Sequence, residues 1–279
     1  MKERRLHMQK LYDMHMHTRF SGDSEANPKD MIAAAKERGL AGLIFTDHLD
    51  WDYWHEPPLF DLDLQHYLPY LGSLAKSEST EEFSIGVGIE LGLQEHLVDR
   101  HKELVTTRPF DFVIGSIHQV NKMDPYYDDF YEGRTIEDAL TEYLECTLRN
   151  LELFHDIDTL GHLDYIVRYA SRVSGEHITI DTTKHQEILE AIFKLLINNN
   201  ICLEVNTGAF RHGLPEPNPS VELLQFYYDC GGRLLTLGAD AHTPEHVALE
   251  FERIPALLKN IGFTSLMHFA HRRGTEIEL

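Results

Sequence analysis

The amino-acid sequence predicts an α/β fold in which strands and helices alternate and the strands close into a distorted barrel. Short β-rich runs alternate with helical patterns from one end of the chain to the other. A chain of 279 residues with 42% apolar residues can bury a large core, and a barrel of roughly this length commonly forms one domain. Potential metal ligands recur where most of the β-rich runs end. We therefore expect a single domain over residues 1–279.

The pattern of apolar and β-branched residues indicates about seven strands. They are expected at Leu11–His17, Ala41–Thr46, Ser84–Glu90, Phe110–Ile117, Thr159–Leu163, Ile201–Asn206 and Arg233–Gly238. Helices are expected in most of the gaps between them.

Three of these helices are the clearest, and capping signals mark two of them. Asn27 and Pro28 are suited to the N-cap and the first helical position, and Gly39 suits the position just after the helix. Two longer helices are expected over Ile136–Phe154 and Thr183–Ile197. Thr135 and Asp138 are spaced as a capping box for the first of them.

Two stretches, Asp50–Thr80 and Asn121–Arg134, interrupt the alternation of strands and helices. Both are rich in Asp, Pro and aromatic residues. They are expected to be long loops or insertions beside a site, although packing against the barrel rim is an equally good interpretation.

Composition excludes several classes of protein. The balance of 46 acidic against 25 basic residues gives a formal charge of -21, which repels an extended nucleic acid over most of the surface. Met1–Lys10 is mostly basic and polar with no apolar segment behind it, and no long apolar run follows, so neither secretion nor membrane insertion is expected. The three cysteines form no CxxC pair, which suits a reducing cytoplasm.

Histidine and carboxylate side chains end nearly every predicted strand. In chain order they are His15 and His17, Asp47 and His48, Glu90, His118, His162 and Asp164, Glu204 and Asn206, and Asp240 and His242. The carboxyl ends of barrel strands converge on one face, so residues remote in sequence meet there. Residues i and i+2 of a strand point to the same side, so His15 with His17, and Asp240 with His242, can each grip one ion.

This mixture of side chains favours transition metals. Imidazole and carboxylate together suit zinc, manganese or iron, whereas calcium and magnesium sites are normally all oxygen. A carboxylate such as Glu90 can also bridge two ions, so at least two ions are expected. Ions about 3.5–4 Å apart can activate a shared water and hold both the attacking and the leaving oxygen of a phosphoryl displacement.

Read along the chain, these motifs resemble the PHP class (polymerase and histidinol phosphatase), and within it the monofunctional histidinol-phosphate phosphatases. The matching stretches are Asp-Met-His-Met-His-Thr at 13–18, Ser-Gly-Asp-Ser at 21–24, Phe-Thr-Asp-His at 45–48, Gly-Ile-Glu at 88–90, Ser-Ile-His-Gln at 116–119, Gly-His-Leu-Asp at 161–164, Leu-Glu-Val-Asn at 203–206 and Gly-Ala-Asp-Ala-His at 238–242. The resemblance covers nearly the whole chain. It implies a (β/α)7 barrel and a trinuclear centre of divalent ions, Zn, Mn or Fe.

The resemblance also implies three groups of ligands. They are His15, His17, Glu90 and Asp240 for one ion, Glu90, His118 and His162 for a second, and Asp23, His48 and His242 for a third. At Asp23 the sequence departs from the pattern, since some relatives have histidine there. For Asp13, Asp47 and Asp164 two interpretations stay open: partners that orient ligand imidazoles, or simple turn and cap residues.

Two arginines follow ligand-bearing strands, Arg168 after the fifth and Arg211 after the sixth. Relatives with phosphatase activity use arginines in such places, and a guanidinium fork matches two phosphate oxygens well. A surface salt bridge is the alternative for each. With these groups the resemblance implies hydrolysis of L-histidinol phosphate, a small phosphorylated metabolite of histidine biosynthesis, in the cytoplasm.

Several points are left open by the sequence. Asp240 or His242 is expected to assist proton transfer to the leaving oxygen, and Asp50, Asp52, Asp124 and Asp128 are candidate carboxylates for the substrate's amine and imidazole. One alternative function is a PHP phosphoesterase acting on nucleotides or short oligonucleotides. Another is a metal-stabilised binding module without turnover, against which the two arginines argue. Oligomeric state is not predicted.

Overall fold

The computed structural model of the chain describes residues 11–56 and 58–279, so the expectation about Met1–Lys10 concerns a segment outside the described residues. All seven predicted strands are present. The first, fourth, fifth, sixth and seventh are β1 (Tyr12–Asp13), β6 (Val113–Ser116), β7 (Thr159–Leu160), β8 (Cys202–Asn206) and β9 (Leu235–Gly238). The second and third are each interrupted, into β2 (Gly42–Phe45) and β3 (His48–Leu49), and into β4 (Ser84–Val87) and β5 (Ile89–Gly92). The predicted bounds of the other five strands were a few residues too generous, whereas β3 and the end of β5 lie beyond the predicted second and third strands.

The strands pair in parallel and follow one another around the barrel. One sheet has the order β1-β2-β4 and the other β3-β5-β6-β7-β8-β9. The hydrogen-bonded ladder is not continuous, yet the first and last strands meet: Met14 N donates to Leu237 O at 3.0 Å and His17 N to Ala241 O at 2.8 Å. The sequence order of the strands is thus their spatial order, and their carboxyl ends lie at one end of the barrel.

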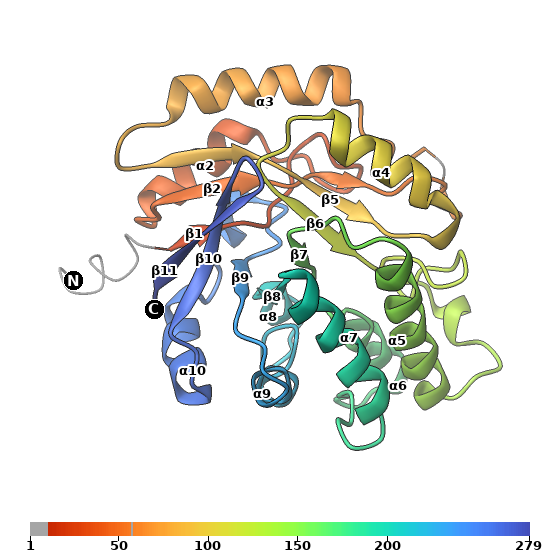
Figure 1. Cartoon of the computed structure of the whole chain (residues 1–279). Helices are drawn as coiled ribbons and strands as arrows, with labels where there is room; N and C mark the ends of the chain where they lie inside the picture. The colour runs from red at the N-terminus through yellow and green to blue at the C-terminus, as the bar shows by residue number, and fades with distance from the viewer. Residues whose placement is uncertain (1–10, 57) are drawn as a thin grey trace.

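Helices surround the strands (Figure 1). The α-helices are α2 (Pro28–Glu37), α3 (Leu64–Glu78), α4 (Val98–Thr107), α5 (Ile136–Leu153), α6 (Ile166–Ser174), α7 (Gln186–Asn199), α8 (Gly208–Arg211), α9 (Val221–Asp229) and α10 (Ile254–Ile261). Single 3-10 turns are η1 (Glu95–Leu97), η2 (Asp128–Tyr131), η3 (Pro244–His246) and η4 (Phe251–Arg253). In the part of the chain described here, no helix has the length and apolar character needed to span a bilayer.

The predicted capping signals are confirmed. The Asn27 side chain accepts a hydrogen bond from Lys29 N at the start of α2, and Gly39 follows the helix with a φ of 74°. Thr135 and Asp138 form both hydrogen bonds of a capping box at the start of α5. Local side-chain chemistry therefore defines these helix ends before any tertiary packing is considered.

Two elements differ from the sequence prediction. The stretch Asp50–Thr80 is not a long loop throughout, because α3 occupies half of it and buries Tyr67, Leu71 and Leu74. Pro69 inside that helix obscured the helical pattern. The chain also ends in an unpredicted antiparallel hairpin of β10 (Ser265–Ala270) and β11 (Arg273–Glu278). The stretch Asn121–Arg134 contains only η2.

The hairpin closes the amino-terminal end of the barrel. Phe269 of β10 joins a buried apolar cluster with residues within or next to β1, β2, β6 and β8: Met14, Ile44, Phe112, Ile114 and Cys202. The hairpin turn is held against the barrel by Arg272, whose Nη2 lies 2.9 Å from Asp156 Oδ1. One end of the barrel is therefore filled with apolar side chains, which leaves the other end for a site.

Candidate metal centre

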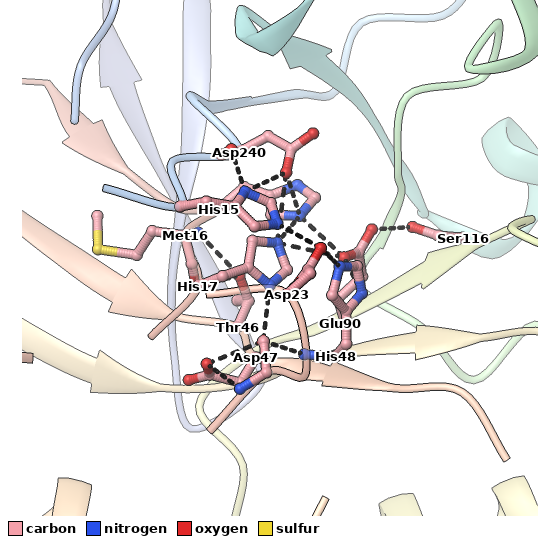
Figure 2. A network of polar contacts seen from close by, with 12 residues as sticks. His15, Met16, His17, Asp23, Thr46, Asp47, His48, Glu90, Ser116 and Asp240 are labelled. Carbon is pink, nitrogen blue, oxygen red and sulfur yellow. Dashed lines mark hydrogen bonds and ion pairs between the residues drawn. The ribbon is translucent and has the colours of Figure 1, made fainter. Parts of the chain in front are cut away.

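All nine side chains predicted as metal ligands lie together at the carboxyl ends of the strands, and Figure 2 shows part of this group around Glu90. Six of them, Asp23, His48, His118, His162, Asp240 and His242, line a cavity of about 470 Å³ whose wall is largely aromatic. Glu90, on β5, lies at the middle of the group, and four of the histidines have a ring nitrogen within 3.2 Å of one of its oxygens. The predicted ligands thus come from positions at or after every strand of the barrel except the sixth.

The first predicted group of ligands is compact. His15 Nε2 and His17 Nε2 lie 3.1 Å apart, and they lie 3.1 and 3.4 Å from Glu90 Oε2. Asp240 Oδ1 lies 3.8 Å from His15 Nε2 and 3.4 Å from His17 Nε2. Ligands about 2.1 Å from a tetrahedral ion are separated by about 3.4 Å. The spacing of these four atoms is therefore that of a cation's coordination shell.

The second and third groups adjoin the first. Glu90 Oε1 approaches His118 Nε2 at 3.2 Å and His162 Nε2 at 3.0 Å. Asp23 Oδ2 lies 3.0 Å from His242 Nε2 and 3.7 Å from His48 Nε2. His48 faces both groups, because its Nδ1 lies 2.9 Å from Glu90 Oε2. The distances thus also allow His48 to contact an ion held by Glu90, and not only the third ion.

Buried polar atoms without hydrogen-bond partners test whether metal ions fit this site. Within the described residues, four such atoms belong to it: His48 Nδ1, Asp50 Oδ2, Glu90 Oε2 and His162 Nδ1. His48 Nδ1 and Glu90 Oε2 are close but not angled for a hydrogen bond. A buried polar atom without a partner is costly, and a cation bound between His48 Nδ1 and Glu90 Oε2 would remove that cost for these two atoms. The residues present therefore fit bound metal ions.

The charge state of Glu90 agrees with this interpretation. Burial by itself raises the pKa of the Glu90 carboxyl, but the neighbouring His15, His118 and His48 more than offset it and hold that pKa well below its usual range. Glu90 is thus ionised although it is fully buried. An ionised carboxylate with an oxygen toward each of two histidine groups suits a ligand that bridges two cations.

A second layer of side chains orients the predicted ligands. His15 Nδ1 donates to Glu204 Oε1 at 2.6 Å, and His118 Nδ1 donates to Asp50 Oδ1 at 2.7 Å. Such carboxylate–imidazole contacts fix which ring nitrogen faces the metal. Glu204 was named in the sequence only among the residues at strand ends. Asp50 was proposed for substrate contact, and its pairing with His118 was not predicted.

Asp13, Asp47 and Asp164 contact no ligand imidazole directly. Asp47 Oδ1 accepts hydrogen bonds from Ser21 Oγ and Thr18 N, and Ser21 Oγ lies 3.0 Å from His17 Nδ1, so Asp47 acts on His17 through a serine. Asp13 accepts from the backbone N–H groups of Ala239 and Ala248. Asp164 accepts from Asn218 Nδ2 and Ser220 N. Asp47 therefore helps to orient a ligand imidazole, through Ser21, whereas Asp13 and Asp164 accept hydrogen bonds from backbone and amide N–H groups.

The backbone around Asp240 is unusual. Asp240 has a φ of 53°, in the left-handed region that few non-glycine residues adopt. Two residues earlier, a Cβ on Gly238 would lie 2.3 Å from His15 Cβ and 2.7 Å from Glu204 Oε1. Glycine is thus required for His15 and Glu204 to lie side by side. Strain of this kind is tolerated where surrounding contacts hold it, often at functional sites.

The two arginines line the cavity but differ in their contacts. Arg168 is buried, and its Nε, Nη1 and Nη2 donate to Asn218 Oδ1, Asp240 Oδ2 and Asn206 Oδ1 at 2.7, 3.0 and 2.9 Å. Arg211 is only half-buried and donates through Nη1 to the backbone oxygen of Asp240 at 2.8 Å. Neither is the surface salt-bridge partner that the sequence left as an alternative.

Of the four carboxylates considered for substrate contact, Asp50 and Asp124 line the cavity, whereas Asp52 and Asp128 pair at the surface with His96 and Arg172. His118 engages Asp50 and, against the effect of burial, brings the pKa of Asp50 down to about 2. Asp124 accepts a hydrogen bond from the Tyr53 hydroxyl at 2.8 Å, and burial raises its pKa to about 6. Of these two carboxylates, Asp124 is therefore the better candidate for substrate contact, because Asp50 is engaged by the predicted ligand His118.

A parallel barrel with histidine and carboxylate side chains at one end is typical of a class of metal-binding hydrolases. Comparison with known proteins identifies the family within this class. Residues 13–208 match the PHP domain, and the chain belongs to the PHP domain family. The predicted fold class and family are thus confirmed.

Several of the similar proteins are histidinol-phosphatases or probable histidinol-phosphatases. The chain is 32% identical over 272 residues to the histidinol-phosphatase of Lactococcus lactis subsp. lactis, covering 94% of this chain and 95% of that one. It is 31% identical to a probable histidinol-phosphatase of Thermotoga maritima, covering 92% and 94%. The crystal structure of histidinol phosphate phosphatase from Lactococcus lactis, complexed with zinc, L-histidinol and phosphate, matches with a TM-score of 0.84 at 29% identity, covering 95% of this chain and 99% of that one.

Proposed function

We propose that this chain is a histidinol-phosphatase that hydrolyses L-histidinol phosphate to L-histidinol and phosphate, a step of histidine biosynthesis. The observation that carries this proposal is the match in sequence and structure over more than nine tenths of both chains to the Lactococcus lactis enzyme, whose crystal structure contains zinc, L-histidinol and phosphate. The cluster of nine ligand side chains at the end of the barrel supplies the corresponding chemistry in this chain.

The proposed cofactor is a set of three divalent ions, Zn, Mn or Fe. His15, His17, Glu90 and Asp240 would hold one, Glu90, His118 and His162 a second, and Asp23, His48 and His242 a third. Zinc in the similar enzyme and the unpartnered buried atoms His48 Nδ1 and Glu90 Oε2 support metal binding here. When bound, the ions make a water nucleophilic near neutral pH and neutralise charge on the phosphoryl oxygens.

The side chains around the cluster would position the substrate. Arg168 and Arg211 line the cavity from two different elements, α6 and α8, and we assign both to the phosphoryl oxygens, where a guanidinium stabilises the charge that develops. The leaving oxygen would take its proton from Asp240 or His242, both in the cavity lining. Asp124, in the aromatic wall, is the proposed partner for the amine or imidazole of the substrate.

Nucleotides and short oligonucleotides are the alternative substrates. Among the described residues of the cavity lining, the permanent cations are Arg168 and Arg211, and the remaining polar groups are mainly carboxylates, histidines and tyrosines. A longer anionic substrate needs further Lys or Arg around the mouth to offset a net charge of -21. The cavity composition thus favours a small phosphate ester that also carries a cation.

A side-by-side kinetic panel tests this proposal. With the metal-loaded protein, L-histidinol phosphate is expected to have a higher kcat/KM than phosphoserine, nucleoside monophosphates or an aryl phosphate. A pocket that pairs with a specific polar group can reject analogues lacking it by about 10⁴-fold. Asp124→Asn should reduce the preference for histidinol phosphate over the aryl phosphate while sparing the aryl phosphate. A nucleotide with the highest kcat/KM would overturn the substrate assignment.

A further inference from the structure

A buried asparagine outside the cavity lining connects the barrel to Arg168. Asn218 is fully buried, and its backbone exchanges two hydrogen bonds with Asn206 at the end of β8, at 2.7 and 2.9 Å. Its side chain Nδ2 donates to Asp164 Oδ1 at 2.6 Å, and its Oδ1 accepts from Arg168 Nε at 2.7 Å. One amide thus joins a carboxylate on one side to a guanidinium on the other.

The charges on both sides fix the orientation of this amide. Asp164 is buried and has both oxygens engaged, Oδ1 by Asn218 and Oδ2 by Ser220 N at 3.0 Å. Rotating the Asn218 amide by half a turn would place its oxygen against the carboxylate and its NH2 group against the guanidinium. Each of these contacts would be repulsive and leave a buried polar group unpaired. The Asn218 oxygen is therefore held toward Arg168.

This contact completes the placement of the Arg168 guanidinium. Nε donates to Asn218, Nη1 to Asp240 Oδ2 at 3.0 Å and Nη2 to Asn206 Oδ1 at 2.9 Å. Three acceptors on three nitrogens of a planar group determine both its position and its plane. Three of its five N–H groups are used in this way, which leaves two for a ligand in the cavity that Arg168 lines.

We propose that Asn218 is a positioning residue that acts through Arg168, with Asp164 orienting its amide. This inference rests on the proposed function in one respect only, that Arg168 binds the phosphoryl group. Without Asn218, the guanidinium keeps two of its three anchors and can rotate about the axis that joins them. The expected loss is in phosphate affinity and in the alignment of the phosphoryl group.

A double-mutant cycle separates this role from a merely structural one. The variants are Asn218→Ala, Arg168→Ala and the pair of both, with Asn150→Ala as a matched control, since Asn150 is a buried asparagine of α5 that lies outside the cavity lining. The readouts are inhibition by inorganic phosphate, kcat and KM for an aryl phosphate, the melting temperature, and metal content by mass spectrometry.

Arg168→Ala should lower kcat/KM by about 10- to 100-fold through loss of charge-assisted hydrogen bonds. Asn218→Ala should weaken phosphate inhibition and lower kcat/KM by about tenfold, with metal content unchanged. In the Arg168→Ala background the Asn218→Ala change should then cost less than about twofold, because its effect passes through the missing guanidinium. Asn150→Ala should leave phosphate inhibition unchanged. Losses that multiply in the pair, or an Asn218→Ala variant within twofold of the wild type, would overturn the proposal.

An exchange variant, Asp164→Asn with Asn218→Asp, covers the case in which Asn218→Ala folds poorly. The new Asn donates to the new Asp and accepts from Ser220 N, and the new Asp accepts from Arg168 Nε, so every pairing is kept. Phosphate inhibition should return to within about fivefold of the wild type. An exchange pair as impaired as the alanine variant argues against the inference. Because the assay uses aryl and inorganic phosphate, a different natural substrate would leave this result intact.

Discussion

The two ends of the barrel are built by the same strands and have opposite chemistry. At the carboxyl end, histidines and carboxylates converge on Glu90, and four buried polar atoms lack hydrogen-bond partners in the described part of the chain. At the amino end, Phe269 of the hairpin β10–β11 packs on apolar side chains such as Phe112 and Met14. Met14 and His15 are adjacent in sequence and belong to the two different environments.

This difference separates stability from function within one fold. Apolar burial stabilises the barrel in proportion to the area removed from water, whereas unpartnered polar atoms and like charges oppose folding. The polar end is therefore tolerated because the rest of the molecule stabilises it, and because bound cations can neutralise it. Changes at the carboxyl end should reduce activity more than stability, and changes at the amino end should do the reverse.

Metal removal gives the largest expected effect. Protein purified without chelator should contain more than one transition-metal ion per chain, and treatment with a strong chelator should abolish phosphatase activity. The far-UV circular dichroism should persist, because the apolar core does not depend on the ions. Re-addition of zinc or manganese should restore turnover. A mass-spectrometric count below one ion per chain in the untreated protein would contradict the proposed centre.

Loss of one predicted ligand comes next. His118→Ala or His162→Ala should lower kcat by far more than about tenfold with a melting temperature close to that of the wild type, because each supports the reaction and not the core. His66→Ala is the matched control: this side chain is 83% exposed on α3 and should change neither property. Near-normal turnover of His118→Ala in a metal-replete assay would remove that residue from the ligand set.

Changes at the amino end of the barrel should instead lower the free energy of unfolding and leave activity nearly unchanged, and this effect is expected to be smaller. Phe269→Ala removes a buried aromatic ring and should lower the free energy of unfolding by about 3 kcal/mol, measured by urea titration. Its kcat/KM should stay within about twofold of the wild type, since the hairpin lies at the end away from the cavity. Leu153→Ala, at a side chain that is 47% exposed, should cost less than about 0.5 kcal/mol. A large loss of activity in Phe269→Ala would show that the two ends are coupled.

Much of the fold followed from patterns within short segments. The seven strands, the N-cap at Asn27 and the capping box at Thr135 were readable because each depends on neighbours within a few residues. The helix α3 was missed because Pro69 interrupts its pattern, and the hairpin was missed because His271-Arg272 is not a typical turn pair, although both residues have positive φ. The single-domain prediction over residues 1–279 remains a prediction.

The sequence alone determined which residue types stand at the strand ends, and hence the metal-binding character of the site and its family. Only the tertiary structure decided which side chain each of them faces. Glu204 pairs with His15 across 189 positions and Asp50 with His118 across 68, and no local pattern carries such pairings. It also decided that Arg168 is held by Asn206, Asn218 and Asp240, three residues remote from it. The physical reason is that barrel closure, a global property of strand order and twist, sets these distances.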